Sequence, residues 1–123
     1  MEKYPIKSFH DLRVWKEAHV LAILVYKQTK QFPREELFAL TSQMRRAAVS
    51  ISSNIAEGFG RSGKKEKSQF YNIARGSLIE LENQYLLARD IGYLSEALWL
   101  SDQNQVVATH RLLNAFIRST KEF

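Results

Sequence analysis

The residue types that bind phosphate are concentrated in one short segment, Arg61-Ser62-Gly63-Lys64-Lys65-Glu66-Lys67. Three lysines and a serine hydroxyl fall where a helix is expected to begin, and the free N–H groups of a first helical turn attract anions. The glycine spacing does not match the P-loop pattern G-x-x-x-x-G-K-[ST]. We therefore predict contact with the phosphate backbone of nucleic acid, with a solvated charged face as the alternative.

The basic surface is expected to continue along the helix that follows this segment. Lys64, Lys67 or Ser68, Tyr71 and Arg75 lie at helical spacing, which places an aromatic ring among cations. Such interleaving permits bases of a single strand to stack on the ring. Arg45 and Arg46 are additional contributors. The candidate nucleic-acid-binding residues are Arg45, Arg46, Arg61, Lys64, Lys65, Lys67, Tyr71 and Arg75.

The charge of the chain is concentrated around the same residues. The 123 residues carry a net charge of +5. Residues 41–75 hold seven basic and two acidic side chains, whereas the rest of the chain holds eleven of each. The whole excess therefore lies in one contiguous part of the sequence, as expected for a localised surface that faces an anion.

A polar segment precedes the basic one and predicts a network of hydrogen bonds. Ser50, Asn54 and Glu57 fall on one side of a helix that Gly58 ends. We expect Glu57 to pair with Arg46 or Arg75, and Glu80 to join the same network. The alternative is that these polar groups contact phosphate or base, although phosphate favours the start of the next helix over the negative end of this one.

The sequence shows no constellation that favours catalysis or metal binding. His10, His19 and His110 lie in separate segments and form neither an H-x-x-x-H pair nor a Glu-x-x-His motif. There is no cysteine, and no serine stands beside a plausible base. We expect no enzymatic activity, no metal site and no cofactor.

The sequence also predicts a cytoplasmic protein that does not enter a membrane. The absence of cysteine agrees with a reducing compartment. Residues 1–10 are polar, so we expect no signal peptide. The longest apolar run, Val20 to Tyr26, is far shorter than the ~20 residues that span a bilayer.

Periodicity and capping residues predict four helices and no strands in a single domain over residues 1–123. Ser8 and Asp11 indicate the start of a first helix of roughly 22 residues, which Phe32-Pro33 ends. The others are expected from Thr41 to about Glu57, from Ser62 or Gly63 to Gly92, and after Ser95. Short connections favour an up-down-up-down antiparallel four-helix bundle.

Two of these helices carry more apolar residues than one buried face requires, which predicts a homo-oligomer. The first helix has Val14, Leu21 and Leu24 beside its main stripe. The last helix adds further residues beside its inner set, namely Leu98, Leu100, Leu112 and Phe116. The alternative is a thick core with a few exposed apolar side chains.

Several stretches of the sequence resemble one known family. They include Asp11-Leu12 with Val14-Trp15-Lys16, Val25-Tyr26 with Phe32-Pro33, and the run from Leu40 to Ala48. The most specific are Ser53-Asn54-Ile55-Ala56-Glu57-Gly58 and Ile73-Ala74-Arg75-Gly76-Ser77-Leu78 with Glu80. The chain resembles the bacterial four-helix-bundle proteins encoded within intervening sequences of 23S ribosomal RNA. That family includes the accessory variability determinant of diversity-generating retroelements, which works with a reverse transcriptase and its template RNA.

The resemblance implies an up-down four-helix bundle, a ring-like homopentamer, a basic surface suited to RNA or DNA, and no catalysis. Three residues depart from the family pattern: Ala39 replaces a frequent glycine, Ser52 a frequent proline and Tyr71 a common leucine. The leading hypothesis is a non-enzymatic nucleic-acid-binding bundle, with RNA as the favoured ligand. The rival is a protein-interaction scaffold or an accessory subunit of a nucleic-acid enzyme such as a reverse transcriptase.

Overall fold

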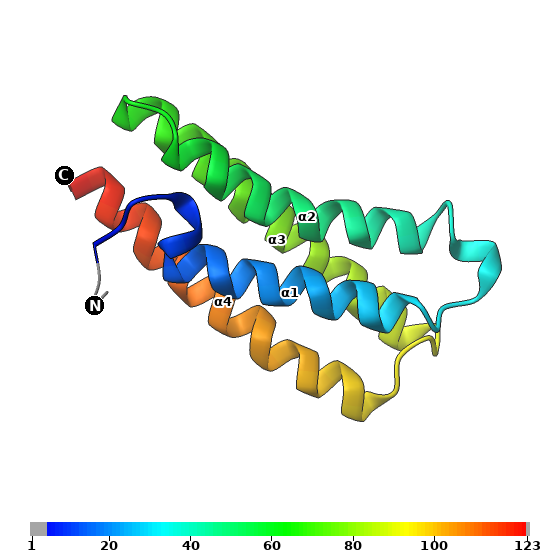
Figure 1. Cartoon of the computed structure of the whole chain (residues 1–123). Helices are drawn as coiled ribbons and strands as arrows, with labels where there is room; N and C mark the ends of the chain where they lie inside the picture. The colour runs from blue at the N-terminus through cyan, green and yellow to red at the C-terminus, as the bar shows by residue number, and fades with distance from the viewer. Residues whose placement is uncertain (1–4, 123) are drawn as a thin grey trace.

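The protein is all-helical. A computed structural model describes residues 5–122 and contains no strand among them. Its four long helices are α1 (Arg13–Thr29), α2 (Leu40–Phe59), α3 (Lys64–Asp90) and α4 (Glu96–Glu122) (Figure 1). Two short 3₁₀ turns, η1 (Phe9–Asp11) and η2 (Arg34–Glu36), precede α1 and α2. The predicted all-α class with four helices is confirmed.

Each long helix packs against two neighbours. Helix α1 contacts α2 and α4, and α3 contacts the same two helices. Figure 1 shows the α1–α2 and α3–α4 connections at one end of the molecule and the α2–α3 turn at the other. The pair α1 and α2 therefore forms one side of the bundle, and α3 and α4 form the opposite side.

The first helix begins later than its capping signal predicts. The carboxylate of Asp11 accepts hydrogen bonds from the backbone N–H groups of Lys7 and Ser8, at 3.0 and 3.1 Å. These bonds lower the pKa of Asp11, but the turn that they close is η1. Leu12 then adopts an extended conformation, with ψ of 129°, and α1 starts at Arg13. The expected helix of 22 residues is therefore 17 residues long.

The start of α2 also differs from the prediction, because Thr41 is a buried residue of its first turn and not its N-cap. The Glu36 carboxylate instead accepts a hydrogen bond from the Leu40 N–H at 3.3 Å. At the other end, α2 continues through Gly58 and Phe59. A Cβ atom at Gly58 would lie 2.6 Å from Cε1 of Tyr71, so glycine is required where α2 and α3 approach each other closely.

The ends of α3 and α4 follow the sequence signals. Gly63 is the N-cap residue of α3. Gly92 has a φ of +86°, in the left-handed region that favours glycine, and lies just beyond the end of α3. The hydroxyl of Ser95 accepts a hydrogen bond from the Leu98 N–H at 3.1 Å, so Ser95 caps α4 as predicted.

The core lies along the axis of the bundle and takes large side chains from every helix. Its fully buried residues include Leu21, Val25, Met44, Ile51, Ile55, Leu78, Leu81, Val106 and Leu113. Tyr71 and Tyr85 are also fully buried. They lie seven residues before and seven residues after Leu78, so the three side chains share one face of α3. The helices are therefore held together mainly by apolar burial.

The surplus apolar residues of α1 differ from those that the sequence indicates. Val14 and Leu21 belong to the core and Leu24 is half-buried, whereas Val20, Ile23 and Tyr26 are exposed. Val14, Leu21 and Leu24 are therefore not surplus residues, because the inner face of α1 is wider than one stripe and includes them. On α4, Leu98 and Leu100 are exposed, but Leu112 and Phe116 pack against the core.

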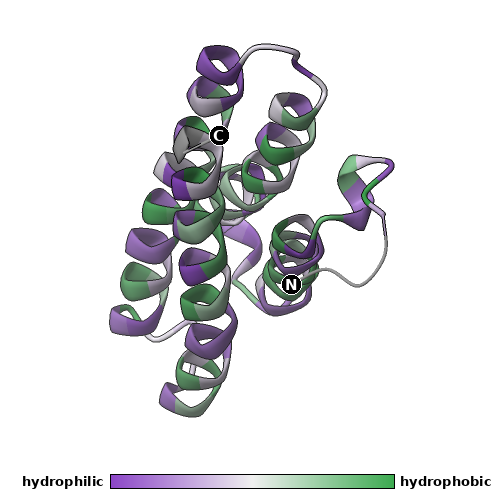
Figure 2. Ribbon diagram, turned by 90° about the vertical axis from the view of Figure 1, so that its left-hand side faces the viewer, coloured by the Kyte–Doolittle hydropathy of each residue, from purple (hydrophilic) through white to green (hydrophobic). Residues whose placement is uncertain are grey.

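Hydrophobic and hydrophilic residues alternate along the helices (Figure 2). No helix in the described part of the chain combines the length and the apolar character needed to cross a membrane.

Candidate nucleic-acid interface

The predicted basic segment forms the turn between α2 and α3 and the first turn of α3. Its first cation, Arg61, is partly neutralised: Nη2 lies 3.1 Å from Oε2 of Glu57, one turn back along α2. The guanidinium carbon is also 4.9 Å from the centre of the Phe70 ring. The Arg61–Glu57 pair is largely exposed, so it contributes little to stability. Arg61 remains accessible at the surface with a defined position.

Lys67 has a structural role that the sequence does not indicate. Its Nζ donates hydrogen bonds to the backbone carbonyls of Phe59, at 2.7 Å, and Gly58, at 3.4 Å. It also lies 5.2 Å from the centre of the Phe59 ring. A cation at this place satisfies the last carbonyls of α2 and complements the negative end of its dipole. Lys67 therefore fastens the start of α3 to the end of α2.

Lys64 and Lys65 are the cations of this segment that face solvent freely. Both are exposed in the first turn of α3, and the part of the chain that the structure describes contains no ion pair for either. The N-cap Gly63 has no side chain to cap the first N–H groups of the helix. Two lysines thus stand beside backbone donors at the positive end of a helix, which is an arrangement that attracts phosphate.

Tyr71 does not belong to the surface, contrary to the sequence prediction. It is 1% exposed, and its ring lies 4.7 Å from that of Phe116 in α4. The missing side chain of Gly58 makes room for it against α2, and burial raises the pKa of Tyr71 to about 12. The ring is therefore unable to stack on a base. Its place seven residues before Leu78, on the core face of α3, was the signal for burial.

Arg75 connects α3 to α4 and does not extend the basic surface as expected. Its Nη1 donates to Oδ1 of Asn114 at 3.2 Å, and its Nη2 donates to Oδ1 of Asn72 at 2.8 Å. The guanidinium is half-buried by these contacts. Arg75 therefore pairs with two amides, and with neither Glu57 nor Glu80.

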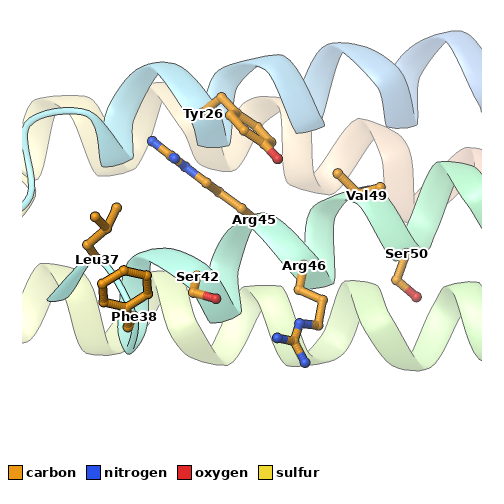
Figure 3. A pocket seen from close by; sticks show the side chains of 8 residues that line it. All are labelled: Tyr26, Leu37, Phe38, Ser42, Arg45, Arg46, Val49 and Ser50. Atoms are coloured by element: carbon orange, nitrogen blue, oxygen red, sulfur yellow. The ribbon is translucent and has the colours of Figure 1, made fainter.

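Arg45 and Arg46 lie in the half of α2 remote from the turn. At about 1.5 Å per residue, the 13 residues from Arg46 to Phe59, where α2 ends, place Arg46 roughly 20 Å along the helix from the α2–α3 turn. Arg45 points toward α1, where its Nε donates to Thr29 Oγ1 at 2.9 Å and its guanidinium lies 4.6 Å from the centre of the Tyr26 ring. Figure 3 shows Arg46 leaving α2 on the other side. The basic window of the sequence therefore separates into two sites.

The predicted polar network is present only in part. Asn54 Nδ2 donates to the carbonyl of Ser50 at 2.8 Å and to its hydroxyl at 3.0 Å. The Ser50 hydroxyl also lies 2.8 Å from that of Ser77 in α3, which joins α2 to α3. Glu57 and Glu80 are both exposed and take no part in it. Glu57 pairs with Arg61 instead of Arg46 or Arg75, and Glu80 lines the cavity between α2 and α3.

A buried polar cluster that the sequence prediction does not include surrounds Asp102, which is 1% exposed. Its carboxylate accepts hydrogen bonds from the hydroxyl of Tyr85 at 2.9 Å and from Nε2 of Gln28 at 3.1 Å. The cluster joins α1, α3 and α4. Burial raises the pKa of Asp102, although the two hydrogen bonds oppose this effect. One acidic residue in the apolar register of α4 was the signal in the sequence.

The three histidines are widely separated, as predicted. His110 Nδ1 lies 2.8 Å from Oε1 of Glu82 across the α3–α4 contact, and His19 stacks on Trp15 with ring centres 4.7 Å apart. His10 lies beside the Ser8 hydroxyl. Among the described residues, no three histidine or acidic side chains are grouped so that they could hold a metal ion.

A family model described as 23S rRNA-intervening sequence protein matches residues 10–115. The chain belongs to this family. All candidate residues of the two basic sites and of the polar network lie within the matched range. No curated protein matches the chain.

One solved structure is similar to this chain over most of its length. It is a protein with unknown function from the S23 ribosomal protein family of Bacteroides thetaiotaomicron, with a TM-score of 0.79 and 23% sequence identity. The match covers 85% of this chain and 95% of the other. At this level of identity, the similarity establishes the helical fold that the two proteins share.

Proposed function

We propose that this member of the family is a non-enzymatic nucleic-acid-binding protein that acts as a homo-oligomer in the cytoplasm, with RNA as its favoured ligand. The observation that carries the proposal is the pair of exposed lysines, Lys64 and Lys65, beside the uncapped N–H groups of α3. Phosphate groups provide most of the electrostatic attraction between proteins and nucleic acids. The net charge of +5 favours the same class of partner.

The surface apolar residues support self-association. On the side formed by α1 and α2, a cavity of about 460 Å³ has Ile23, Tyr26 and Val49 among its lining residues. On the opposite side, exposed Ile79 and Leu86 of α3, and Leu100 and Val107 of α4, are each seven residues apart. Seven residues are two helical turns, so each pair forms an apolar ridge.

Contact between two different faces of identical chains generates a closed ring or an open fibre. We therefore propose a head-to-tail contact in which the α1–α2 side of one copy meets the α3–α4 side of the next. The resemblance to the family favours a ring-like pentamer of up-down-up-down antiparallel bundles. The alternation of the helix connections between the two ends of the molecule supports that topology (Figure 1).

The exposed apolar surface also favours a second candidate function, that of a scaffold or accessory subunit. In this case, the α1–α2 side would bind a different protein, such as a reverse transcriptase that already carries RNA. Purified protein that captures such an enzyme but binds no RNA by itself would favour this function over the first.

A mobility-shift assay with single-stranded RNA tests the proposal. At low salt and micromolar protein, we expect the wild-type chain to bind. Replacing both lysines, as Lys64→Glu and Lys65→Glu, should weaken binding by about ten-fold or more, because two phosphate contacts are lost and two repulsions gained. Lys67 is left unchanged because it holds the end of α2.

The matched control makes the same change of charge elsewhere, as Lys7→Glu with Arg34→Glu, at exposed residues that do not line the α1–α2 cavity. This control should retain most of the affinity. Equal losses in the two variants would show that only net charge matters, and absence of binding by the wild-type chain would contradict the proposal.

A further inference from the structure

The groove between α2 and α3 contains a cavity of about 450 Å³ that lies apart from the lysine site. Its volume falls within the range of roughly 300–1,000 Å³ that is usual for small-ligand pockets. The side chains that line it are mainly polar and include Ser42, Arg46, Ser50, Ser77 and Glu80, with Phe38 as the large apolar member. Such a mixture is suited to a ligand with both a flat apolar face and polar edges.

Opposite charges face this cavity without neutralising each other. Arg46 of α2 and Glu80 of α3 both line it, and both are exposed. No ion pair involves either side chain in the portion of the chain that the structure describes. A carboxylate accepts two hydrogen bonds side by side, and a guanidinium donates to phosphate. The cavity therefore offers an acceptor pair and an anion-binding group to one ligand.

The floor of the cavity is held in place by hydrogen bonds within the protein. The Ser50 and Ser77 hydroxyls lie 2.8 Å apart, and Asn54 Nδ2 donates to the Ser50 hydroxyl at 3.0 Å. The Ser50–Ser77 bond joins α2 to α3, so it fixes the distance between the two helices beside Arg46 and Glu80, and the bond from Asn54 holds the Ser50 hydroxyl in place. A ligand would meet a preorganised site, which lowers the entropic cost of binding.

Phe38 supplies an aromatic surface that is open to solvent. Its side chain is 93% exposed, in the connection just before α2, and it lines this cavity as well as a cavity of about 640 Å³ toward α1. Figure 3 shows the ring standing beside α2 on the same stretch as Ser42 and Arg46. An exposed phenyl ring next to a cation is the combination on which unpaired bases stack.

Of the four RNA bases, guanine has the hydrogen-bond donors that match the carboxylate of Glu80. A base splayed out of a single strand is read along its Watson–Crick edge, and guanine alone presents two adjacent donors there, N1–H and the N2 amino group. Both oxygens of Glu80 would accept from these donors. Adenine and cytosine present one donor next to an acceptor, which would face the second carboxylate oxygen and repel it.

We propose that the α2–α3 cavity binds an unpaired guanine of single-stranded RNA. Glu80 accepts its N1–H and N2–H groups, Phe38 stacks on its ring, and Arg46 binds an adjacent phosphate. This inference rests on the proposed function and deepens it, because it assigns base recognition to one site and leaves general phosphate binding to Lys64 and Lys65.

Fluorescence anisotropy with short RNA probes tests this site on the full chain. The probes are oligouridines with one central guanosine, adenosine or inosine, since inosine keeps N1–H but lacks the N2 amino group. We expect guanosine to bind about ten-fold more tightly than adenosine, with inosine between them. Glu80→Gln should reduce the guanosine preference to less than two-fold, and Phe38→Ala should weaken binding of all three probes. Glu96→Gln, at an exposed acid of α4, is the matched control and should retain the preference.

Each other outcome overturns the inference in a distinguishable way. Equal affinity for the three probes, or a guanosine preference that survives Glu80→Gln, overturns the guanine site. The proposed function stays intact in that case if Lys64→Glu with Lys65→Glu still weakens RNA binding. Failure to bind any probe overturns the proposed function as well. A variant at Phe38 or Glu80 that changes the mass of the assembly in light scattering but not the base preference would identify the cavity as a contact between copies, and that result also overturns the inference.

Discussion

The absence of a side chain at Gly58 allows α2 and α3 to approach each other closely. Tyr71 occupies the space that a side chain at residue 58 would take, and its ring carbon lies 2.6 Å from the place of the missing Cβ. Because this contact involves a fully buried ring, the neighbouring atoms have little freedom to move. The end of α2 and the lysines that follow it therefore depend on this one glycine for their position.

We expect Gly58→Ala to lower the free energy of unfolding by about 1–3 kcal/mol through overpacking. Gly76→Ala is the matched control, since a Cβ at residue 76 meets no atom within 4 Å inside α3. That change should stabilise the protein by about 0.5–1 kcal/mol, because alanine favours a helix more than glycine does. Urea denaturation measures both, and equal effects of the two substitutions would contradict the close contact at Gly58.

Asp102 should give the stability of the protein a pH dependence of its own. Burial raises its pKa in the folded state above the value in the unfolded chain. The folded state therefore favours the protonated carboxyl, and this contribution is fully present below the unfolded pKa and is lost as the pH rises through the folded one.

Asp102→Asn removes that titration. We expect the difference in unfolding free energy between the wild type and this variant to shift with pH, with the wild type losing stability relative to the variant as the pH rises from about 4 toward neutrality. Denaturant melts at several pH values measure it. A difference that is constant over this range would show that Asp102 titrates as it does in the unfolded chain.

At the scale of the elements, helix ends were predictable where the signal is local. Ser95 caps α4 through its own hydroxyl, Gly92 takes a positive φ, and Pro33 follows the end of α1. Ser8 and Asp11 were misread because the same bonds that begin an α-helix also close a 3₁₀ turn. The number of helices was therefore predictable to a greater degree than the exact start of α1.

The roles of side chains between helices were not predictable in the same way. By their spacing, three residues of α3 are expected on one face. In the structure, however, Lys67 caps the end of α2, Tyr71 is buried and Arg75 binds Asn114. Their partners come from α2 and α4, and sequence spacing along α3 does not specify which residues of another helix lie opposite. Lys64 and Lys65 stayed exposed because they precede the α2–α3 contact.

For the whole molecule, the two apolar sides make a heterologous assembly testable. We expect light scattering to report a multiple of the 14.3 kDa chain mass at working concentration. Ile23→Glu, on the α1–α2 side, and Leu100→Glu, on the α3–α4 side, should each prevent assembly, because both residues are exposed apolar side chains.

A mixture of these two variants distinguishes a head-to-tail contact from a symmetric one. Each variant retains one intact side, so equal amounts should form one junction and give a heterodimer but no larger ring. A wild-type monomer would contradict the assembly, and full rings in the mixture would contradict the head-to-tail contact.

The central claim is that Lys64 and Lys65 hold the phosphate backbone of RNA. The most direct test is the salt dependence of single-stranded RNA binding by the wild-type chain and by the variant in which both lysines are replaced by glutamine. Each phosphate contact on a single strand contributes about 0.7 to the slope of log affinity against log salt. We therefore expect the variant to have a slope that is smaller by about 1.4. Equal slopes for the two proteins, or wild-type binding that does not weaken with salt, would contradict the claim.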